Sequence, residues 1–193
     1  MNKPLFLFVG RSASGKTTIA NMLENNDKLN QIQSYTTRLP RYENEPGHVF
    51  ITNEEYDKLE NIMASTVYNG NHYCTTLDQI KAADIYVVDV PGVQTLLDNY
   101  ERLNRLIHII LFEASTYCRI QRMLERGDSD THVVRRLLID EEYDWFEKLK
   151  ETIYEHNVKV PIHSVNADND LQVVYYQVKN IIETVQCLLG RIS

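Results

Sequence analysis

The sequence lacks an excess of positive charge, a long apolar run and a signal for cleavage or membrane insertion. Its formal net charge at pH 7 is −7, which argues against a broad surface for nucleic acid or for an anionic membrane. No apolar run approaches the roughly 18 residues that cross a bilayer, and the first ten residues lead into a glycine-rich loop. We therefore expect a soluble, cytoplasmic protein with neither a nucleic-acid nor a membrane partner.

Paired cysteines, internal repeats and low-complexity linkers are also missing. The three cysteines, Cys74, Cys118 and Cys187, lie far apart and form no CxxC motif, so neither a disulfide framework nor a zinc site is predicted. We expect buried or incidental thiols. At 193 residues the chain is long enough for one hydrophobic core, and one domain with an inserted lobe is the expected organisation.

Four short apolar runs predict a buried parallel sheet. They are PLFLFVG (4–10), IYVVDV (85–90), LIHIILF (106–112) and VPIHSV (160–165). Each has the length of a strand and leads into a turn or a helical pattern, which is typical of a parallel sheet buried on both faces. The fold class is therefore α/β.

The clearest predicted helix covers residues 170–189, with a cap at Asp170. Its predicted buried face consists of Val174, Val178, Ile181, Val185 and Leu188. We expect this helix to pack on the sheet without taking part in chemistry.

Between residues 33 and 82 the pattern changes to short, half-polar strands, HVFIT, STVYN and NHYCT. Two capping boxes, Thr52 to Glu55 and Thr76 to Gln79, predict short helices beside them. This texture predicts a small β-rich lobe inserted between the first and second long strands. Residues 62–76 carry no charge, which leaves a plain hairpin and the wall of a pocket open as alternatives.

The segment GRSASGKT, Gly10 to Thr17, fits the phosphate-loop pattern and lies between a predicted strand and a predicted helix. In such a loop, backbone N–H groups surround phosphate oxygens and the helix N-terminus adds positive potential. Lys16 is expected to reach the outer phosphates, and the Thr17 hydroxyl to ligate Mg²⁺. The residues expected at ATP here are Gly10, Ser12, Ala13, Ser14, Gly15, Lys16, Thr17 and Thr18.

Asp89 follows the second predicted strand, at the edge where parallel sheets bind ligands. It is expected to hold Mg²⁺ or to contact the acceptor substrate. Asp89 to Gly92 also matches the Asp-x-x-Gly pattern of GTPases, but the Asn-Lys-x-Asp motif that reads guanine in those proteins is absent.

Two sets of arginines predict further phosphate contacts. In SYTTRLPR, Arg38 and Arg41 lie three residues apart and suit a dianionic phosphate, since each can donate paired hydrogen bonds. The alternative is a solvated basic turn. The second set is Arg119, Arg122, Arg126, Arg135 and Arg136, of which Arg122 and Arg126 share a helical face. It predicts a lid, although pairing with Glu141, Glu142 and Asp144 is the alternative for some members.

A triphosphate loop, an arginine pair and an arginine lid together indicate phosphoryl transfer between two phosphorylated partners. The loose transition state of this reaction needs positioning and charge neutralisation more than a covalent nucleophile. An acceptor phosphate is already nucleophilic at neutral pH, so no catalytic base is required.

Seven segments, in order, resemble the guanylate kinase family: GRSASGKTT, SYTTRLPR, GHVFITNEEYDKL, YNGNHYCTTLDQI, VVDVPGV, RMLERGDSDTHVVRRL and VNADND. They cover nearly all of the chain. The resemblance implies a P-loop kinase fold in one domain, with a core (1–33, 84–124 and 141–193), a nucleoside-monophosphate-binding lobe (34–83) and a helical lid (125–140). It further implies ATP and Mg²⁺ as cofactors, nucleotides as substrates, and a monomer or a homodimer.

The resemblance also implies roles for individual positions. Lys16, Arg122, Arg126 and Arg136 match residues that stabilise the transferred phosphoryl group, and Asn166 lies in the loop beside the adenine. Residues matching the acceptor site are Ser34, Arg38, Arg41, His48, Ala64, Tyr73, Thr75 and Asp89. The residues expected at the metal are Thr17 and Asp89.

Three positions depart from the family pattern. His48 stands near where the family has a phosphate-binding Tyr, Val87 replaces a further Asp, and Ala64 replaces the Glu that reads guanine. Ser65, Thr66 or a backbone carbonyl are the candidate substitutes for that Glu. We therefore hypothesise an acceptor other than ordinary GMP: a deoxynucleotide, a pyrimidine nucleotide or a modified base.

Two alternative functions remain open from the sequence. One is a phosphokinase for another phosphorylated metabolite, such as a sugar phosphate. The other is a non-catalytic interaction module that resembles guanylate kinases. The complete GKT sequence at residues 15–17 argues against such a module.

Overall fold

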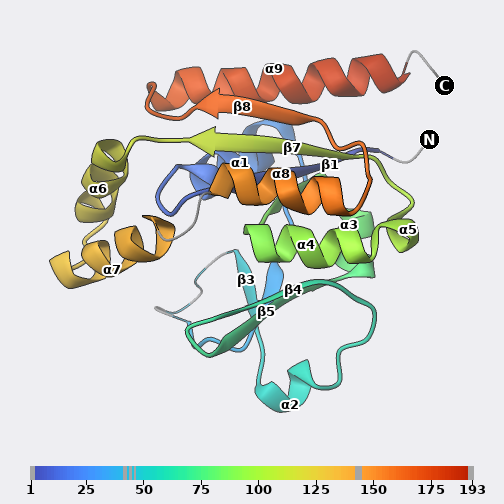
Figure 1. Cartoon of the computed structure of the whole chain (residues 1–193), viewed down its shortest axis with the longest axis horizontal. Coiled ribbons are helices and arrows are strands. Elements are labelled where there is room, and N and C mark those ends of the chain that lie inside the picture. Colours follow the sequence, from blue (N-terminus) through green and yellow to red (C-terminus); the bar gives the residue numbers. More distant parts are fainter. Residues whose placement is uncertain (1–2, 41–42, 44, 46, 142–144, 191–193) are drawn as a thin grey trace.

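The four apolar runs form the central sheet of the protein (Figure 1). The structure is a computed structural model that describes all residues except 1–2, 41–42, 44, 46, 142–144 and 191–193. The strands are parallel, in the order β6-β1-β7-β8. Their bounds are β1 Leu5–Gly10, β6 Ile85–Val87, β7 Ile107–Glu113 and β8 Ile162–Asn166. The predicted α/β class is confirmed.

The predicted second strand is too long at its C-terminal end. We expected it to reach residue 90, but β6 ends at Val87 and helix α4 (Val90–Asp98) follows. Asp89 is the N-cap of α4 and Pro91 lies in its first turn, a combination that starts a helix and ends the strand.

Helices cover both faces of the sheet. On one face, α1 (Lys16–Asp27) and α9 (Leu171–Gly190) pack against Phe6, Phe8 and Ile110. On the other face, α4 and α8 (Trp145–Glu155) pack against Leu5, Leu7 and Ile109. The short helix α5 (Tyr100–Leu103) precedes β7. Both strand faces are thus buried, which explains the uninterrupted apolar runs.

Helix α9 confirms the predicted cap, because Asp170 Oδ1 accepts the N–H of Gln172 at 2.8 Å. The predicted buried face is partly wrong. Tyr175 and Ile182 are buried, whereas Ile181 is half-buried and Leu188 is 53% exposed. Since a helix turns about 100° per residue, residues seven apart share a face, and Ile182 follows Tyr175 onto the sheet.

A second, smaller sheet lies below the core in Figure 1. Its strands, in the order β3-β2-β5-β4, are β2 Ser34–Thr36, β3 His48–Phe50, β4 Ile62–Tyr68 and β5 Asn71–Thr76. The β4–β5 hairpin turns at Asn69 and Gly70, which both have positive φ, as a tight two-residue turn requires. The capping boxes at Thr52 and Thr76 are confirmed, and they start α2 (Asn53–Tyr56) and α3 (Leu77–Ala82).

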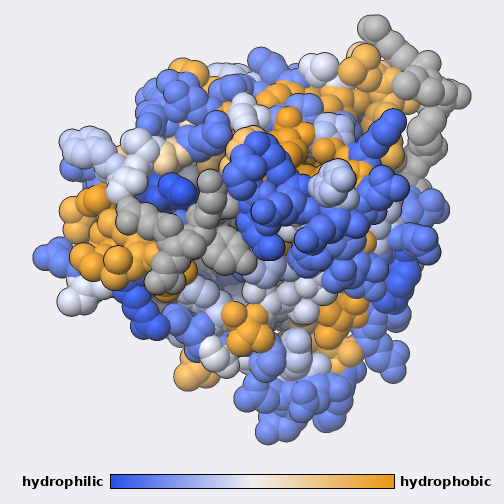
Figure 2. All heavy atoms as spheres, in the orientation of Figure 1, coloured by the Kyte–Doolittle hydropathy of each residue, from blue (hydrophilic) through white to orange (hydrophobic). Residues whose placement is uncertain are grey.

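The helices α6 (Thr116–Glu125) and α7 (Asp130–Glu141) form an arm beside the sheet (Figure 1). Arg135 Nη2 of α7 donates to Asn69 Oδ1 at the hairpin turn, at 2.9 Å. Apolar atoms gather over this arm in Figure 2, where Val134 and Leu138 of α7 are exposed. The arm therefore reaches from the core to the small sheet and spans the space between them.

Among the described residues, no helix is both long and apolar enough to cross a membrane. All three cysteines are free: Cys74 is buried, Cys118 is half-buried and Cys187 is exposed.

Candidate active site

A cavity of about 440 Å³ lies where the phosphate loop, the small sheet and the arm meet. It brings together eight of the residues expected at the site, Gly10, Ser12, Lys16, Ser34, His48, Tyr73, Asp89 and Arg136. Ser65 and Thr66, the candidate substitutes for the missing Glu, also line it, as do Tyr86 and Asp140, which were not predicted as site residues. The cavity therefore has one wall from the phosphate loop and one from the lobe.

The phosphate loop takes its shape from three residues with positive φ. They are Gly10, Ala13 and Gly15. A Cβ on Gly10 would lie 2.5 Å from the carbonyl oxygen of Phe112, so only glycine fits there. Ala13 holds a φ of 60° despite its side chain, which costs roughly 1–2 kcal/mol.

Helix α1 begins directly after this loop, and its N-cap Gly15 offers no side-chain hydrogen bond. The first N–H groups of α1 therefore have no capping side chain. A helix end of this kind is suited to bind an anionic phosphate group.

Lys16 folds back onto the loop. Its Nζ donates to the carbonyl oxygens of Gly10 at 2.7 Å and Arg11 at 2.9 Å, and to Ser14 Oγ at 3.3 Å. Burial lowers the pKa of Lys16 to about 8, although Asp140 and Asp89 act to raise it. The negative charge of a bound phosphate would favour the protonated form of Lys16.

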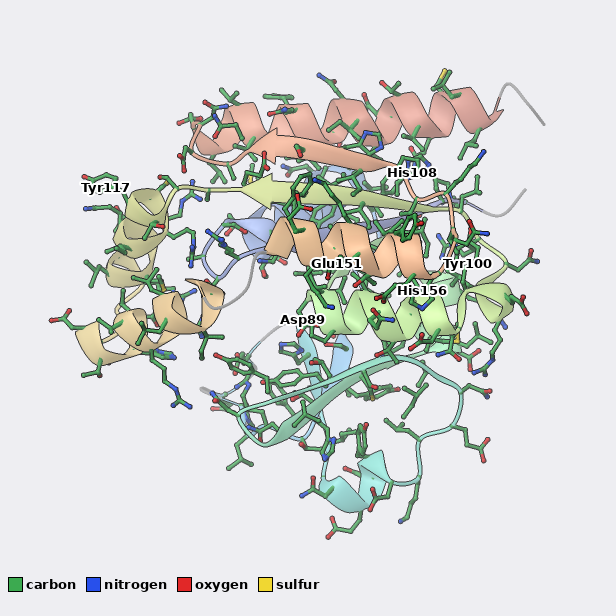
Figure 3. The ribbon with its side chains drawn as sticks, in the orientation of Figure 1. Asp89, Tyr100, His108, Tyr117, Glu151 and His156 are labelled. Atoms are coloured by element: carbon green, nitrogen blue, oxygen red, sulfur yellow. The ribbon has the colours of Figure 1, made fainter. Side chains whose placement is uncertain are left out.

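Asp89 lies just after the C-terminal end of β6, at the start of α4 and beside the small sheet (Figure 3). Its Oδ1 accepts the N–H of Gly92 at 2.9 Å. Burial raises the pKa of Asp89, while hydrogen bonds from Gly92 and Thr66 and the charge of Lys16 lower it. Thr17, the other residue expected at the metal, is exposed at the start of α1.

The two residues expected at the metal both carry oxygen donors. Thr17 and Asp89 offer a hydroxyl and a carboxylate, which are hard oxygen donors that suit Mg²⁺, an ion that keeps several of its waters. Among the described residues, no cluster of three or more His, Cys, Asp or Glu is present. The donors thus fit a magnesium ion held mainly by nucleotide phosphates and water.

Arg38 has a partner that the sequence did not reveal. Its two Nη atoms donate to Glu45 Oε1 and Oε2, at 2.9 and 3.1 Å, and Nη1 also donates to the carbonyl oxygen of Leu39 at 2.8 Å. The hydrogen bonds and charge of Glu45 raise the pKa of Arg38. The guanidinium also lies 5.2 Å from the centre of the Phe50 ring. Arg41, the second expected phosphate ligand, lies outside the described residues.

Three side chains of the lobe wall contact one another in series. Ser34 Oγ lies 3.0 Å from His48 Nδ1, and the rings of His48 and Tyr73 meet edge to face at 5.6 Å. The parallel pairing of β2 and β3 places Ser34 opposite His48. Strand pairing thus brings together residues fourteen positions apart.

Two other expected acceptor residues lie beneath this wall. Ala64 is fully buried in the apolar cluster that also contains Met63 and Ile80. Thr75 is fully buried, and its Oγ1 donates to Gln79 Oε1 at 3.0 Å. Register shifts between Ile62 and Ala64, and the next residues of β4, Ser65 and Thr66, line the cavity instead.

Tyr86 closes the cavity from the core side. It is 6% exposed, and burial raises the pKa of its phenol. A hydrogen bond links its side chain to that of Thr75. Tyr86, Ser65 and Thr66 line this side of the cavity together with Asp89.

A second cavity, of about 430 Å³, lies along the start of α1. The expected site residues that line it are Ala13, Ser14, Gly15, Thr18, Arg122 and Arg126. Arg122 Nη2 donates to the carbonyl oxygen of Ala167 at 2.6 Å, and Arg126 forms an ion pair with Asp128. Asn166, expected beside the adenine, lines a different cavity with Arg11 and Phe146.

Arg136, one of the arginines expected in a lid, lines the main cavity. Its Nε donates to His132 Nε2 at 3.2 Å, one helical turn earlier. The alternative partners Glu142 and Asp144 lie outside the described residues. The partners that the structure does show, Asp128 for Arg126 and Asp140 for Arg119, were not predicted.

No family model matches the sequence. A guanylate kinase from Cupriavidus metallidurans is 30% identical over 148 residues, covering 69% of this chain and 67% of that protein. A guanylate kinase from Nitrosomonas europaea is 27% identical over 146 residues, covering 69% of this chain and 71% of that protein.

Proposed function

Because the chain belongs to the guanylate kinase family, we propose that it transfers the terminal phosphoryl group of ATP to a nucleoside 5′-monophosphate. The observation that carries this proposal is the main cavity, which is lined by Lys16 of the phosphate loop, by the lobe residues Ser34, His48 and Tyr73, and by Arg136 of the arm. One cavity can thus hold a donor phosphate and an acceptor phosphate side by side.

Four cations are proposed to stabilise the transferred phosphoryl group: Lys16, Arg122, Arg126 and Arg136. Lys16 and Arg136 line the main cavity, and Arg122 and Arg126 line the neighbouring one beside the loop. Charge in this reaction spreads over the oxygens of the moving group, so fixed positive charges lower its barrier. The acceptor phosphate needs no base to become a nucleophile.

Thr17 and Asp89 would hold the magnesium ion that accompanies ATP. When bound, Mg²⁺ neutralises charge on the phosphate oxygens. Asp89 is already oriented for such a role by the N–H of Gly92. Val87 at the cavity wall contributes no carboxylate, so the protein would supply few of the ligands.

The acceptor phosphate is proposed to bind Arg38 with Tyr73, His48 and Ser34, and with Arg41, which lies outside the described residues. Arg38 is fixed by Glu45 and by Phe50. An arginine held in this way loses little side-chain entropy when a phosphate arrives.

The proposed acceptor base is not the guanine of ordinary GMP. At residue 64, where guanylate kinases carry a guanine-reading Glu, this chain has a buried Ala. A hydrogen bond to a charged group contributes roughly 1.5–3 kcal/mol, and losing a built pairing can remove about 10⁴-fold discrimination. The hydroxyls of Thr66 and Tyr86, with Asp89, would face the base instead.

A panel of ribonucleoside and deoxyribonucleoside monophosphates, assayed with ATP and Mg²⁺, tests both parts of the proposal. We expect turnover with at least one of them and a clear preference over GMP. GMP as the best acceptor would refute the base assignment. Turnover only with a sugar phosphate would indicate a different phosphokinase.

Two lysines at the two ends of α1, Lys16 in its first turn and Lys28 at its C-cap, provide a matched comparison for that assay. Lys16→Ala should abolish turnover without unfolding the protein. Lys28→Ala, at the exposed opposite end of α1, should leave it unchanged. A wild-type protein that fails to bind ATP–Mg²⁺ in calorimetry would be an interaction module and not a kinase.

A further inference from the structure

A buried ion pair grips one residue of the phosphate loop from both sides. Arg119 of α6 and Asp140 of α7 are 0% and 2% exposed and form an ion pair. Asp140 Oδ2 accepts the backbone N–H of Ser12 at 3.2 Å, and Arg119 Nε donates to the backbone carbonyl of Ser12 at 2.9 Å. The amide and the carbonyl of a single loop residue are therefore both fixed by the arm.

The gripped residue directly precedes the strained one. Ala13 holds a φ of 60°, in the left-handed region that a residue with a Cβ disfavours and a glycine adopts readily. Such a conformation persists only where the surrounding structure enforces it. The N–H groups that would receive phosphate follow immediately, from Ser14 to Lys16.

A buried ion pair adds little net stability compared with apolar side chains of the same volume. Its contribution here is geometric, because the backbone N–H and the backbone carbonyl of Ser12 both form directional hydrogen bonds with the pair. Asp140 also lies one helical turn after Arg136, and both line the main cavity with Ser12 and Lys16.

We propose that the Arg119–Asp140 pair is a positioning device that keeps the phosphate loop in its phosphate-binding shape and ties it to the arm helix that carries Arg136. Neither residue is expected to touch the reacting atoms. The proposal rests on the proposed ATP site, and it makes ATP affinity, but not acceptor affinity, depend on the pair.

Asp140→Asn and Arg119→Lys test the proposal, since both substitutions nearly keep the volume while they weaken the ion pair or its geometry. We expect the dissociation constant of ATP–Mg²⁺, measured by calorimetry, to rise about tenfold, which corresponds to about 1.4 kcal/mol. The acceptor KM should change less than threefold.

The decisive measurement adds Ala13→Gly to each variant. Glycine relaxes the strain that the pair opposes, so Ala13→Gly should restore ATP affinity to within threefold of the wild type. A role of the pair in global stability alone would give no such rescue. Circular-dichroism melting curves confirm that each variant is folded at the assay temperature.

Arg105→Leu is the matched control. Arg105 is also buried and donates to the carbonyl oxygens of Lys3, Pro4 and Ala83, away from the loop. It should lower the melting temperature without changing ATP affinity at temperatures where it is folded. A loss of affinity like that of Asp140→Asn would overturn the proposal.

The outcomes separate this proposal from the function on which it rests. A wild-type protein that does not bind ATP–Mg²⁺ refutes the proposed function itself. If the wild type binds and the pair variants bind equally well, or if Ala13→Gly fails to rescue them, the positioning role is wrong. Tighter binding by Asp140→Asn would mean that the carboxylate competes with phosphate for the Ser12 N–H, and this too would overturn the proposal.

Discussion

The charge of Lys16 should decide how ATP affinity depends on pH. Burial lowers the pKa of this lysine to about 8 in the protein without nucleotide. Asp140 and Asp89 raise the pKa, but Arg119 and Arg136 act in the same direction as burial. A substantial fraction of the protein therefore carries a neutral Lys16 at pH 8.

Bound phosphate oxygens favour the charged form of Lys16 and raise its pKa. If they restore the ordinary value of 10.5, the coupling between proton and nucleotide amounts to roughly 3 kcal/mol. Binding then takes up a proton above about pH 8. The dissociation constant of ATP–Mg²⁺ should be constant between pH 7 and 7.5, and should rise by up to about tenfold per pH unit between 8 and 10.

Calorimetry across this range, in two buffers with different ionisation enthalpies, measures both the affinity and the proton uptake. Lys16→Arg is the control, because a guanidinium stays charged throughout. Its affinity should be independent of pH in the same window. A flat profile for the wild type up to pH 9.5, or an equal slope for Lys16→Arg, would refute the reasoning.

Two further predictions concern the acceptor side and the α4 cap. Arg38→Lys should raise the acceptor KM about tenfold while the ATP KM changes little, because a lysine cannot reproduce the paired hydrogen bonds to Glu45 and phosphate. Steady-state kinetics with each substrate varied in turn measures both KM values. Equal changes in the two KM values would contradict this prediction. Gly92→Ala should destabilise the protein by about 1–3 kcal/mol, because the added Cβ would lie 2.5 Å from Val88 Cγ2 and 2.9 Å from Asp89 Oδ1. Urea unfolding measures the change in stability. An unaltered midpoint would show that the start of α4 can shift to accept the methyl group.

Features whose physics is local could be predicted from the sequence. The phosphate loop lies between a buried strand and a helix, and the capping boxes at Thr52 and Thr76 start the helices that they predict. Each of these features depends on groups within a few residues of one another. The prediction of a strand at 85–90 was wrong at its C-terminal end, although the information there is also local. Asp89 and Pro91 are typical of a helix start, and they begin α4.

Contacts between distant segments could not be read in this way. Glu45 lies seven residues from Arg38, and no local pattern predicts that its carboxylate accepts hydrogen bonds from the guanidinium. Ala64 occupies the position of a missing base reader, yet the irregular register at the start of β4 and the apolar cluster beneath it place its side chain off the cavity wall. The residues around position 64 do not by themselves predict that Ala64 is buried.

The sequence by itself determined the α/β class, the phosphate loop with Lys16 and the family, because these depend on apolar periodicity and on residues adjacent in the chain. Only the tertiary structure decided which charges meet. Arg119 and Asp140 are 21 residues apart, and the packing of α6 against α7 brings both to Ser12 of the phosphate loop. An ion pair requires its partners within a few ångströms, and separation along the chain says little about distance in a folded core.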